Sequence, residues 1–186
     1  EIIATIDESK YLCNDTVNII FDINKSFDIK FLLGILNSKL INSWFKKTYP
    51  EGLHIKINQL ETIPIPEISL ETQQPFIALA DKMLTLNETL QKKSGNFLKV
   101  VKQTFALEKI STKLETFYNL DFDGFMKELK QKLTPKTKLE WLEVFEETKK
   151  SLQEIQTQIA ATDKEINALV YKLYDLTEEE IKIVEG

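Results

Sequence analysis

The sequence predicts an α+β fold in which a small β-containing part is followed by long helices. Short runs of β-branched residues between turn-forming residues open the chain, and such runs are typical of strands. Beyond residue 68, apolar residues recur every three or four positions, which indicates amphipathic, coiled-coil-like helices. We therefore expect two domains, residues 1–68 with strands and one helix, and residues 69–186 as a helical scaffold.

Three short segments at the start of the chain are predicted strands: residues 1–7, 11–13 and 17–21. The first is a β-branched run that suits a buried strand. In the third, the alternation of a strand places Val17 and Ile19 on one face.

A helix is predicted over residues 28–48, because its apolar residues form one broad face. Trp44 and Phe45 continue this face, so we expect them in the core. Pro50 ends the helix, since proline disfavours helix in the residue before it. Residues 55–58 then alternate apolar and polar side chains, which predicts a half-buried strand with its polar residues outward.

The second part contains three predicted helices. The first begins near Thr72 and runs to about Val101, with a possible break at residues 94–96. The second begins at Thr134 and Pro135, a cap followed by proline at the first helical position.

This second helix extends to about residue 173, and its apolar residues from 152 onward form a coiled-coil seam. We expect the seam to pack against the first helix as an antiparallel pair, or as a plain helical bundle. Thr177 and Glu180 form a capping box, which predicts a short last helix over residues 178–184.

The composition excludes several kinds of active site. The chain has one cysteine, Cys13, and one histidine, His54, so it has neither an internal disulfide nor the residues of a cysteine-rich zinc site. These two residues can form a nucleophile pair in principle, but a free cysteine is more often simply buried. Glycine-rich phosphate loops and hydrolase motifs are absent. We expect no catalysis by this chain alone.

Membrane insertion is not predicted either. No apolar run approaches the roughly 20 residues of a membrane span, and no secretory leader opens the sequence. A single cysteine suits a reducing cytoplasm, which is the expected location. The chain begins with Glu1 rather than methionine, so we expect a piece of a longer protein.

The charge is unevenly distributed. The net charge is −5, which argues against a wholly basic nucleic-acid binder. Residues 24–60, however, hold six lysines and only two acidic residues. All 24 basic residues are lysine, so the bidentate arginine contact to guanine is not available.

Several motifs carry a resemblance. Residues 32–45 read LLGILNSKLINSWF, residues 52–57 read G-x-x-x-K-I, and residues 60–66 read L-x-x-I-P-I-P. Residues 163–181 read DKEINALVYKLYDLTEEEI. Together they resemble the target-recognition region of bacterial DNA adenine-N6 methyltransferases. The resemblance is greatest to Type IIG restriction-modification enzymes and more distant to Type I specificity subunits.

Two positions depart from the family pattern. Asn167 stands where the family usually has aspartate, and Asp175 stands where it usually has glycine. Aspartate tolerates the left-handed conformation that a helix stop requires, so we expect the stop to survive.

The resemblance implies a recognition part without its chemistry. The family's N-P-P-Y motif, its glycine-rich S-adenosylmethionine motif and a nuclease motif are not in this sequence. It therefore implies an upstream methyltransferase domain of the same chain that binds S-adenosylmethionine, with Mg²⁺ if a nuclease is also present. No cofactor is expected in these 186 residues.

The implied partner is double-stranded DNA, held through phosphates and read through base edges. Four lysines suit phosphate contacts: Lys39, Lys46, Lys47 and Lys56. Three further residues flank the turn and are candidates for bases or sugars: Tyr49, His54 and Asn58. Lysines at a helix C-terminus also pair favourably with the helix dipole, and a loop histidine often has no specific role.

A second hypothesis is a protein-interaction module whose coiled-coil-like helices bind a partner subunit or form a homodimer. Net acidity favours it, whereas the lysine-rich stretch favours DNA. The discriminating observation is whether Lys46, Lys47 and Lys56 form one surface patch.

Overall fold

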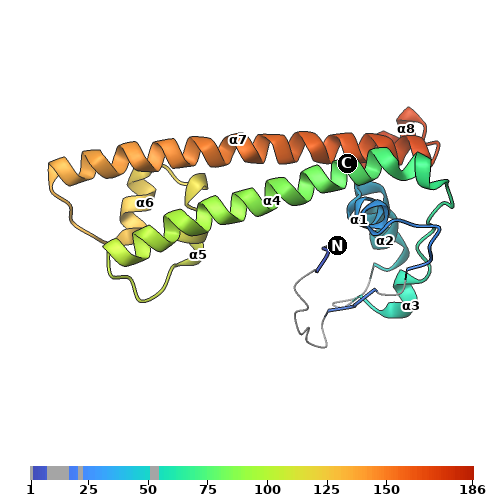
Figure 1. Cartoon of the computed structure of the whole chain (residues 1–186), viewed down its shortest axis with the longest axis horizontal. Helices are drawn as coiled ribbons and strands as arrows, with labels where there is room; N and C mark the ends of the chain where they lie inside the picture. Colours follow the sequence, from blue (N-terminus) through green and yellow to red (C-terminus); the bar gives the residue numbers. More distant parts are fainter. Residues whose placement is uncertain (1, 8–16, 21–22, 51–54) are drawn as a thin grey trace. The chain divides into compact units, whose positions relative to one another are not determined.

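The computed structural model describes residues 2–7, 17–20, 23–50 and 55–186, and every regular element in these ranges is a helix (Figure 1). The helices are α1 Ile29–Asn37, α2 Lys39–Thr48, α3 Ile57–Leu60, α4 Leu70–Thr104, α5 Thr112–Glu115, η1 Phe117–Asn119 (a 3₁₀ turn), α6 Phe122–Leu129, α7 Pro135–Leu173 and α8 Glu178–Glu185. They divide between two compact units. Unit 1 is residues 1–83 with 162–186, and unit 2 is residues 84–161, so α4 and α7 each contribute to both.

The predicted α+β class is wrong, because the described residues form no strand and the fold is all-α. Near the N-terminus the reason is visible in the hydrogen bonds of Ala4. Its N–H donates to Asn37 Oδ1 at 2.9 Å, and its carbonyl accepts from Asn37 Nδ2 at 3.0 Å. A side-chain amide at the end of α1 thus takes both backbone hydrogen bonds of Ala4, in the place that a neighbouring strand would have in a sheet. Residues 17–20 form no strand, and residues 11–13 lie outside the described ranges.

The predicted strand over residues 55–58 is also wrong. Its second half is the first turn of α3, with Lys56 as N-cap. The Lys56 N–H donates to Gln59 Oε1 at 2.9 Å, and the Lys56 carbonyl accepts from Leu60 N at 3.2 Å. A run of four alternating residues is too short to distinguish a strand from a helical turn held by its own side chains.

The predicted helix over residues 28–48 is two helices that meet at Ser38. This residue is extended (φ −65°, ψ 151°), ends α1 and caps α2. Its Oγ donates to Ile35 O at 2.7 Å and accepts from Ile41 N at 3.3 Å. The apolar periodicity continues through the break, which is why the pattern did not reveal it.

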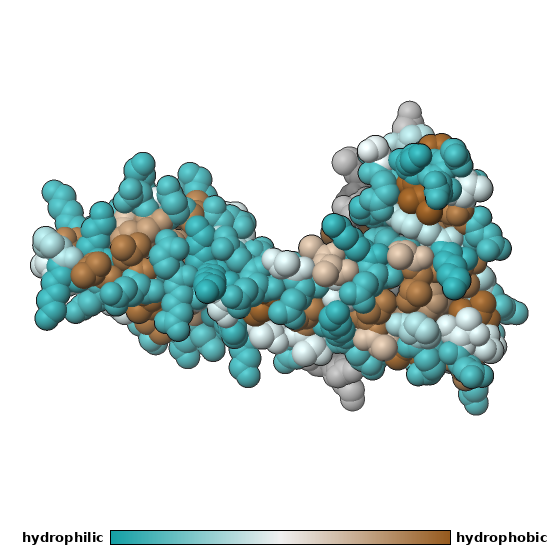
Figure 2. All heavy atoms as spheres, turned by 90° about the horizontal axis from the view of Figure 1, so that it is seen from above, coloured by the Kyte–Doolittle hydropathy of each residue, from teal (hydrophilic) through white to brown (hydrophobic). Residues whose placement is uncertain are grey.

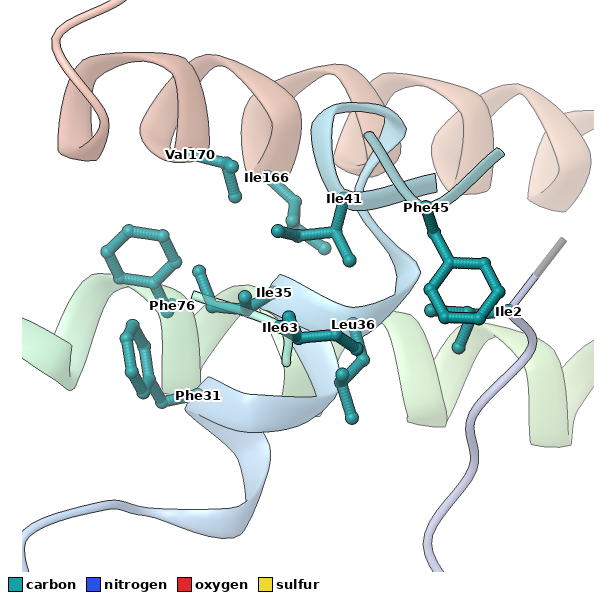
Figure 3. Close-up of a cluster of buried hydrophobic side chains, with 10 residues drawn as sticks. All are labelled: Ile2, Phe31, Ile35, Leu36, Ile41, Phe45, Ile63, Phe76, Ile166 and Val170. Atoms are coloured by element: carbon teal, nitrogen blue, oxygen red, sulfur yellow. The ribbon is translucent and has the colours of Figure 1, made fainter. Parts of the chain in front are cut away.

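The core of unit 1 joins residues that are far apart in sequence. Phe31 of α1 packs edge-on against Phe76 of α4, with ring centroids 5.2 Å apart. Ile166 and Val170 point from α7 toward the side chains of α1 and α2 (Figure 3). The ten buried residues are Ile2, Phe31, Ile35, Leu36, Ile41, Phe45, Ile63, Phe76, Ile166 and Val170. Phe45 is buried and Trp44 packs against this cluster, as expected from the apolar face.

The core of unit 2 is mainly aromatic. Its buried residues are Phe97, Val101, Leu114, Phe117, Phe122, Phe125, Leu129, Phe145 and Leu152. The rings of Phe125 and Phe145 lie 4.8 Å apart, and those of Phe97 and Phe117 lie 4.2 Å apart. The helix break predicted near Gly95 does not occur, because α4 continues to Thr104.

Three helix-end predictions are confirmed. Helix α7 begins at Pro135, after Thr134. Helix α8 opens with the capping box, in which Thr177 Oγ1 accepts from Glu180 N and Glu180 Oε2 accepts from Thr177 N. Asp175 adopts the left-handed conformation (φ 51°) just beyond α7.

The seam predicted along α7 contributes buried residues to both units. Leu152 and Ile155 are buried in unit 2, and Thr162 and Ile166 are buried in unit 1. Supercoiling of the two long helices stays a prediction.

Candidate nucleic-acid interface

The C-terminal end of α2 exposes two of the predicted DNA-contacting lysines. Lys46 and Lys47 lie in its last turn, where a positive charge is favoured by the helix dipole. Both side chains are exposed. The dipole accounts for their placement as well as DNA binding does, so their function stays a prediction.

Tyr49 ties the end of α2 to the residues after α3. Its hydroxyl and Thr62 Oγ1 are hydrogen-bonded at 2.8 Å. Its ring lies against those of Phe45 (centroids 5.1 Å apart) and Trp44 (6.4 Å). The phenol therefore already has a hydrogen-bond partner within the protein, and a base or sugar contact by Tyr49 stays a prediction.

Helix α3 and its N-cap expose polar side chains, while other residues hold the helix to unit 1. Lys56 and Asn58 are exposed, whereas Leu60 packs against the unit 1 core. Asn18 Nδ2 donates to Ile55 O at 2.9 Å, just before the helix. Lys56 and Asn58 are exposed as predicted, but Ile57 between them is exposed as well, so the predicted alternation of a half-buried strand is not observed. His54 lies outside the described residues.

Lys39 differs from the other lysines because it begins α2 and is already paired. Its Nζ makes an ion pair with Glu185 of α8. It lies seven residues before Lys46, about 10 Å away along a helix axis. Its predicted phosphate contact would have to compete with this ion pair.

The same ion pair changes the pKa of Glu185 in the last helix. Glu185 also accepts a hydrogen bond from the Tyr171 hydroxyl at 2.6 Å. The hydrogen bond from Lys39, followed by that from Tyr171, lowers the pKa of Glu185 below its ordinary value. Burial, together with Glu185, raises the pKa of Tyr171.

Asn167 completes the junction between α1 and α2. It is buried, and its Oδ1 accepts from the Lys39 N–H at 2.8 Å. Its Nδ2 donates to the carbonyl and the carboxylate of Asp163. Sequence reasoning missed this role, and the available signal was asparagine at a position where the family pattern has aspartate.

The described residues contain no cluster of three metal-ligating side chains. Burial raises the pKa of Tyr174 to about 12, and its hydroxyl donates to Pro64 O at 2.6 Å, so the phenol is held neutral. None of the helices described is both long and apolar enough to cross a membrane.

Comparisons with known proteins assign the chain to a family. Residues 69–170, more than half of it, match the family described as a domain of unknown function, DUF8810. The chain belongs to the DUF8810 family. The DUF8810 region takes in all of α4 and almost all of α7.

A second match covers the region of the candidate interface. Residues 1–65 match the TaqI-like C-terminal specificity domain and so contain α1, α2 and α3. This match confirms the resemblance to a restriction-modification target-recognition region. Searches of curated proteins and of solved structures found no match.

Proposed function

We propose that this DUF8810 chain is the sequence-specific DNA recognition module of a bacterial restriction-modification adenine-N6 DNA methyltransferase. The observation that supports it is the match of residues 1–65 to a specificity domain, because this region also carries the lysine-rich stretch. In this proposal the catalytic domain lies upstream in the same protein and acts in the cytoplasm. It binds S-adenosylmethionine, and Mg²⁺ is needed if a nuclease is attached.

In this mechanism some residues position the protein on the DNA and another reads a base. Lys46, Lys47 and Lys56 contact phosphates and fix the register of the protein on the duplex. Asn58 reads a base edge, since a side-chain amide can pair bidentately with adenine. The upstream domain then receives the target adenine, which must leave the stack to be methylated.

Methyl transfer from labelled S-adenosylmethionine to mixed-sequence DNA tests the proposal. The protein is the full natural reading frame, compared with a form that lacks residues 1–186. Incorporation into adenine that disappears with the deletion is the expected result, and the modified sites give the recognised sequence. A folded full-length protein that neither transfers methyl groups nor binds the cofactor would contradict the proposal.

The second candidate is a protein-interaction module, favoured by exposed apolar side chains in unit 2. Val100, Leu139 and Val144 are each about half exposed. In Figure 2 hydrophobic side chains reach the surface among hydrophilic ones. Light scattering of the purified chain tests the homodimer form of this candidate. A dimer that Leu139→Lys dissociates would favour it, and a monomer would count against it.

A further inference from the structure

One apolar side chain of α3 points away from the core. Ile57 is 65 % exposed, whereas Ile63 is 7 % exposed and Ile55 and Leu60 pack against the unit 1 core. An exposed isoleucine loses the stabilisation that burial would give, and single cases of this kind are common on surfaces. The position of Ile57 between two exposed polar residues, Lys56 and Asn58, gives this case a specific interpretation.

The backbone under Ile57 is fixed on both sides. Before it, Ile55 O accepts from the Asn18 amide at 2.9 Å. After it, Thr62 Oγ1 donates to Gln59 O at 2.7 Å and is itself hydrogen-bonded to Tyr49. A side chain on an anchored turn can meet a binding partner with little loss of conformational entropy.

The surroundings of Ile57 restrict what can cover it. The lysines at the end of α2 are joined to this turn through the Tyr49–Thr62 hydrogen bond, and Lys56 precedes Ile57 directly. In α3 and its two caps the acidic residue is Glu61, at the C-terminal end. A partner that covers Ile57 should therefore offer an anionic group to Lys56, hydrogen-bonding groups to Asn58 and an apolar group to Ile57.

The major groove of duplex DNA has these properties, because the 5-methyl group of thymine lies beside the adenine edge that an asparagine amide reads. We propose that Ile57 contacts the 5-methyl group of a thymine in the target site, next to the base read by Asn58. This inference rests on the proposed function and names the base class that α3 recognises.

The test uses duplex DNA with and without that methyl group. The protein from the full natural reading frame first selects its site from a random duplex pool. Each thymine of the site is then replaced singly by deoxyuridine, which pairs identically. Wild-type protein should lose about three- to fivefold in affinity at one position, the contribution of one buried methyl group. Ile57→Ala should bind the thymine and uracil versions equally, while Ile57→Val should keep most of the discrimination.

The matched control is Ile183→Ala, because Ile183 of α8 is 62 % exposed and has no part in the inference. It should discriminate as the wild type does. Two results would overturn the role of Ile57 while leaving DNA recognition intact. In the first, the protein binds a selected site but no thymine-to-uracil replacement changes its affinity. In the second, Ile57→Ala still binds the thymine duplex more tightly than the uracil duplex. Failure to enrich any sequence would overturn both this inference and the proposed function.

Discussion

The two units bury different kinds of side chain. Among the described residues, unit 1 buries Ser38, Gln73, Thr162 and Asn167, whereas the one buried polar residue of unit 2 is Ser94. Unit 2 instead buries a group of phenylalanine rings around Phe117, Phe125 and Phe145.

The difference follows from the backbone that each unit must satisfy. Unit 1 contains extended segments and a helix break, whose N–H and carbonyl groups need partners outside regular structure. Gln73 supplies three such partners, because it accepts from Asp28 N and donates to Ser26 O and Ile68 O. The candidate interface lies in the unit that buries such polar side chains, whereas in unit 2 the carbonyls of Leu120 and Tyr118 accept from Lys149 and Gln153, neither of which is buried.

The largest loss of stability is expected from a substitution in the aromatic core of unit 2. Phe145→Ala should lower the free energy of unfolding by about 3–5 kcal/mol, because it removes a buried ring and leaves a cavity. Chemical denaturation measures this, and amide exchange should rise first in η1 and α6. Val144→Ala, at an exposed neighbouring position, is the control. Equal costs for the two variants would contradict the assigned core.

A smaller effect is expected from the polar contacts of unit 1. Gln73→Met keeps the size of the side chain but leaves three backbone groups without partners. We expect a loss of about 3 kcal/mol in denaturation experiments, since each buried unsatisfied group costs about 1–3 kcal/mol. Gln74→Met, which changes an exposed neighbour, should stay within about 0.5 kcal/mol of wild type. A neutral Gln73→Met would remove the proposed contrast between the units.

A substitution of Asn167 also tests the contribution of buried polar contacts to the stability of unit 1. In Asn167→Asp a second carboxylate replaces the amide that lies 3.1 Å from Asp163 Oδ2. We expect a loss of about 1–3 kcal/mol at pH 7, because an acceptor faces an acceptor. The loss should shrink in acid, when one carboxyl group is protonated and can donate. Adding Asp163→Asn should restore stability at pH 7, and a double variant as weak as the single one would contradict this account.

The smallest effect is expected at Glu185. Its pKa lies below the ordinary value of 4.5 in the folded protein, so its contribution to stability is present above that value and is lost as the pH falls through the lowered pKa. Glu185→Gln should therefore cost less than about 1 kcal/mol at pH 7, since the ion pair is partly exposed, and should cost less still at an acidic pH below that lowered pKa. Thermal unfolding at both pH values measures the difference. A loss of stability in Glu185→Gln that becomes larger at acidic pH would contradict this pH dependence.

Helix ends that carry their own chemical signal were predictable from the sequence. Proline after Thr134 and the capping box of Thr177 depend on neighbouring residues alone, whereas the left-handed Asp175 was expected from the family pattern. The apolar face of residues 28–48 likewise placed Phe45 in the core.

The fold class was not predictable in the same way, because the decisive contacts join distant residues. The backbone of Ala4 is hydrogen-bonded to Asn37, and the first N–H of α2, that of Lys39, donates to Asn167, 128 residues later in the sequence. Short β-branched runs favour strands until such side chains take the place of a neighbouring strand. The exposed lysines of the candidate site were predictable from charge, whereas the ion pair of Lys39 with Glu185 was not.

The salt dependence of DNA binding tests most directly whether the interface lies on α2 and α3 of unit 1. Each phosphate contact that is lost should reduce the log–log slope by about 0.9. The triple variant Lys46→Gln, Lys47→Gln, Lys56→Gln should therefore reduce the slope by about 2–3 on a duplex that carries the selected site.

The control variant Lys99→Gln, Lys102→Gln, Lys109→Gln changes the same charge on exposed lysines of unit 2. It should leave the slope within about 0.5 of wild type, as expected if these lysines contact no phosphate. Equal reductions in the two variants, or a larger one in the control, would contradict a DNA interface on α2 and α3.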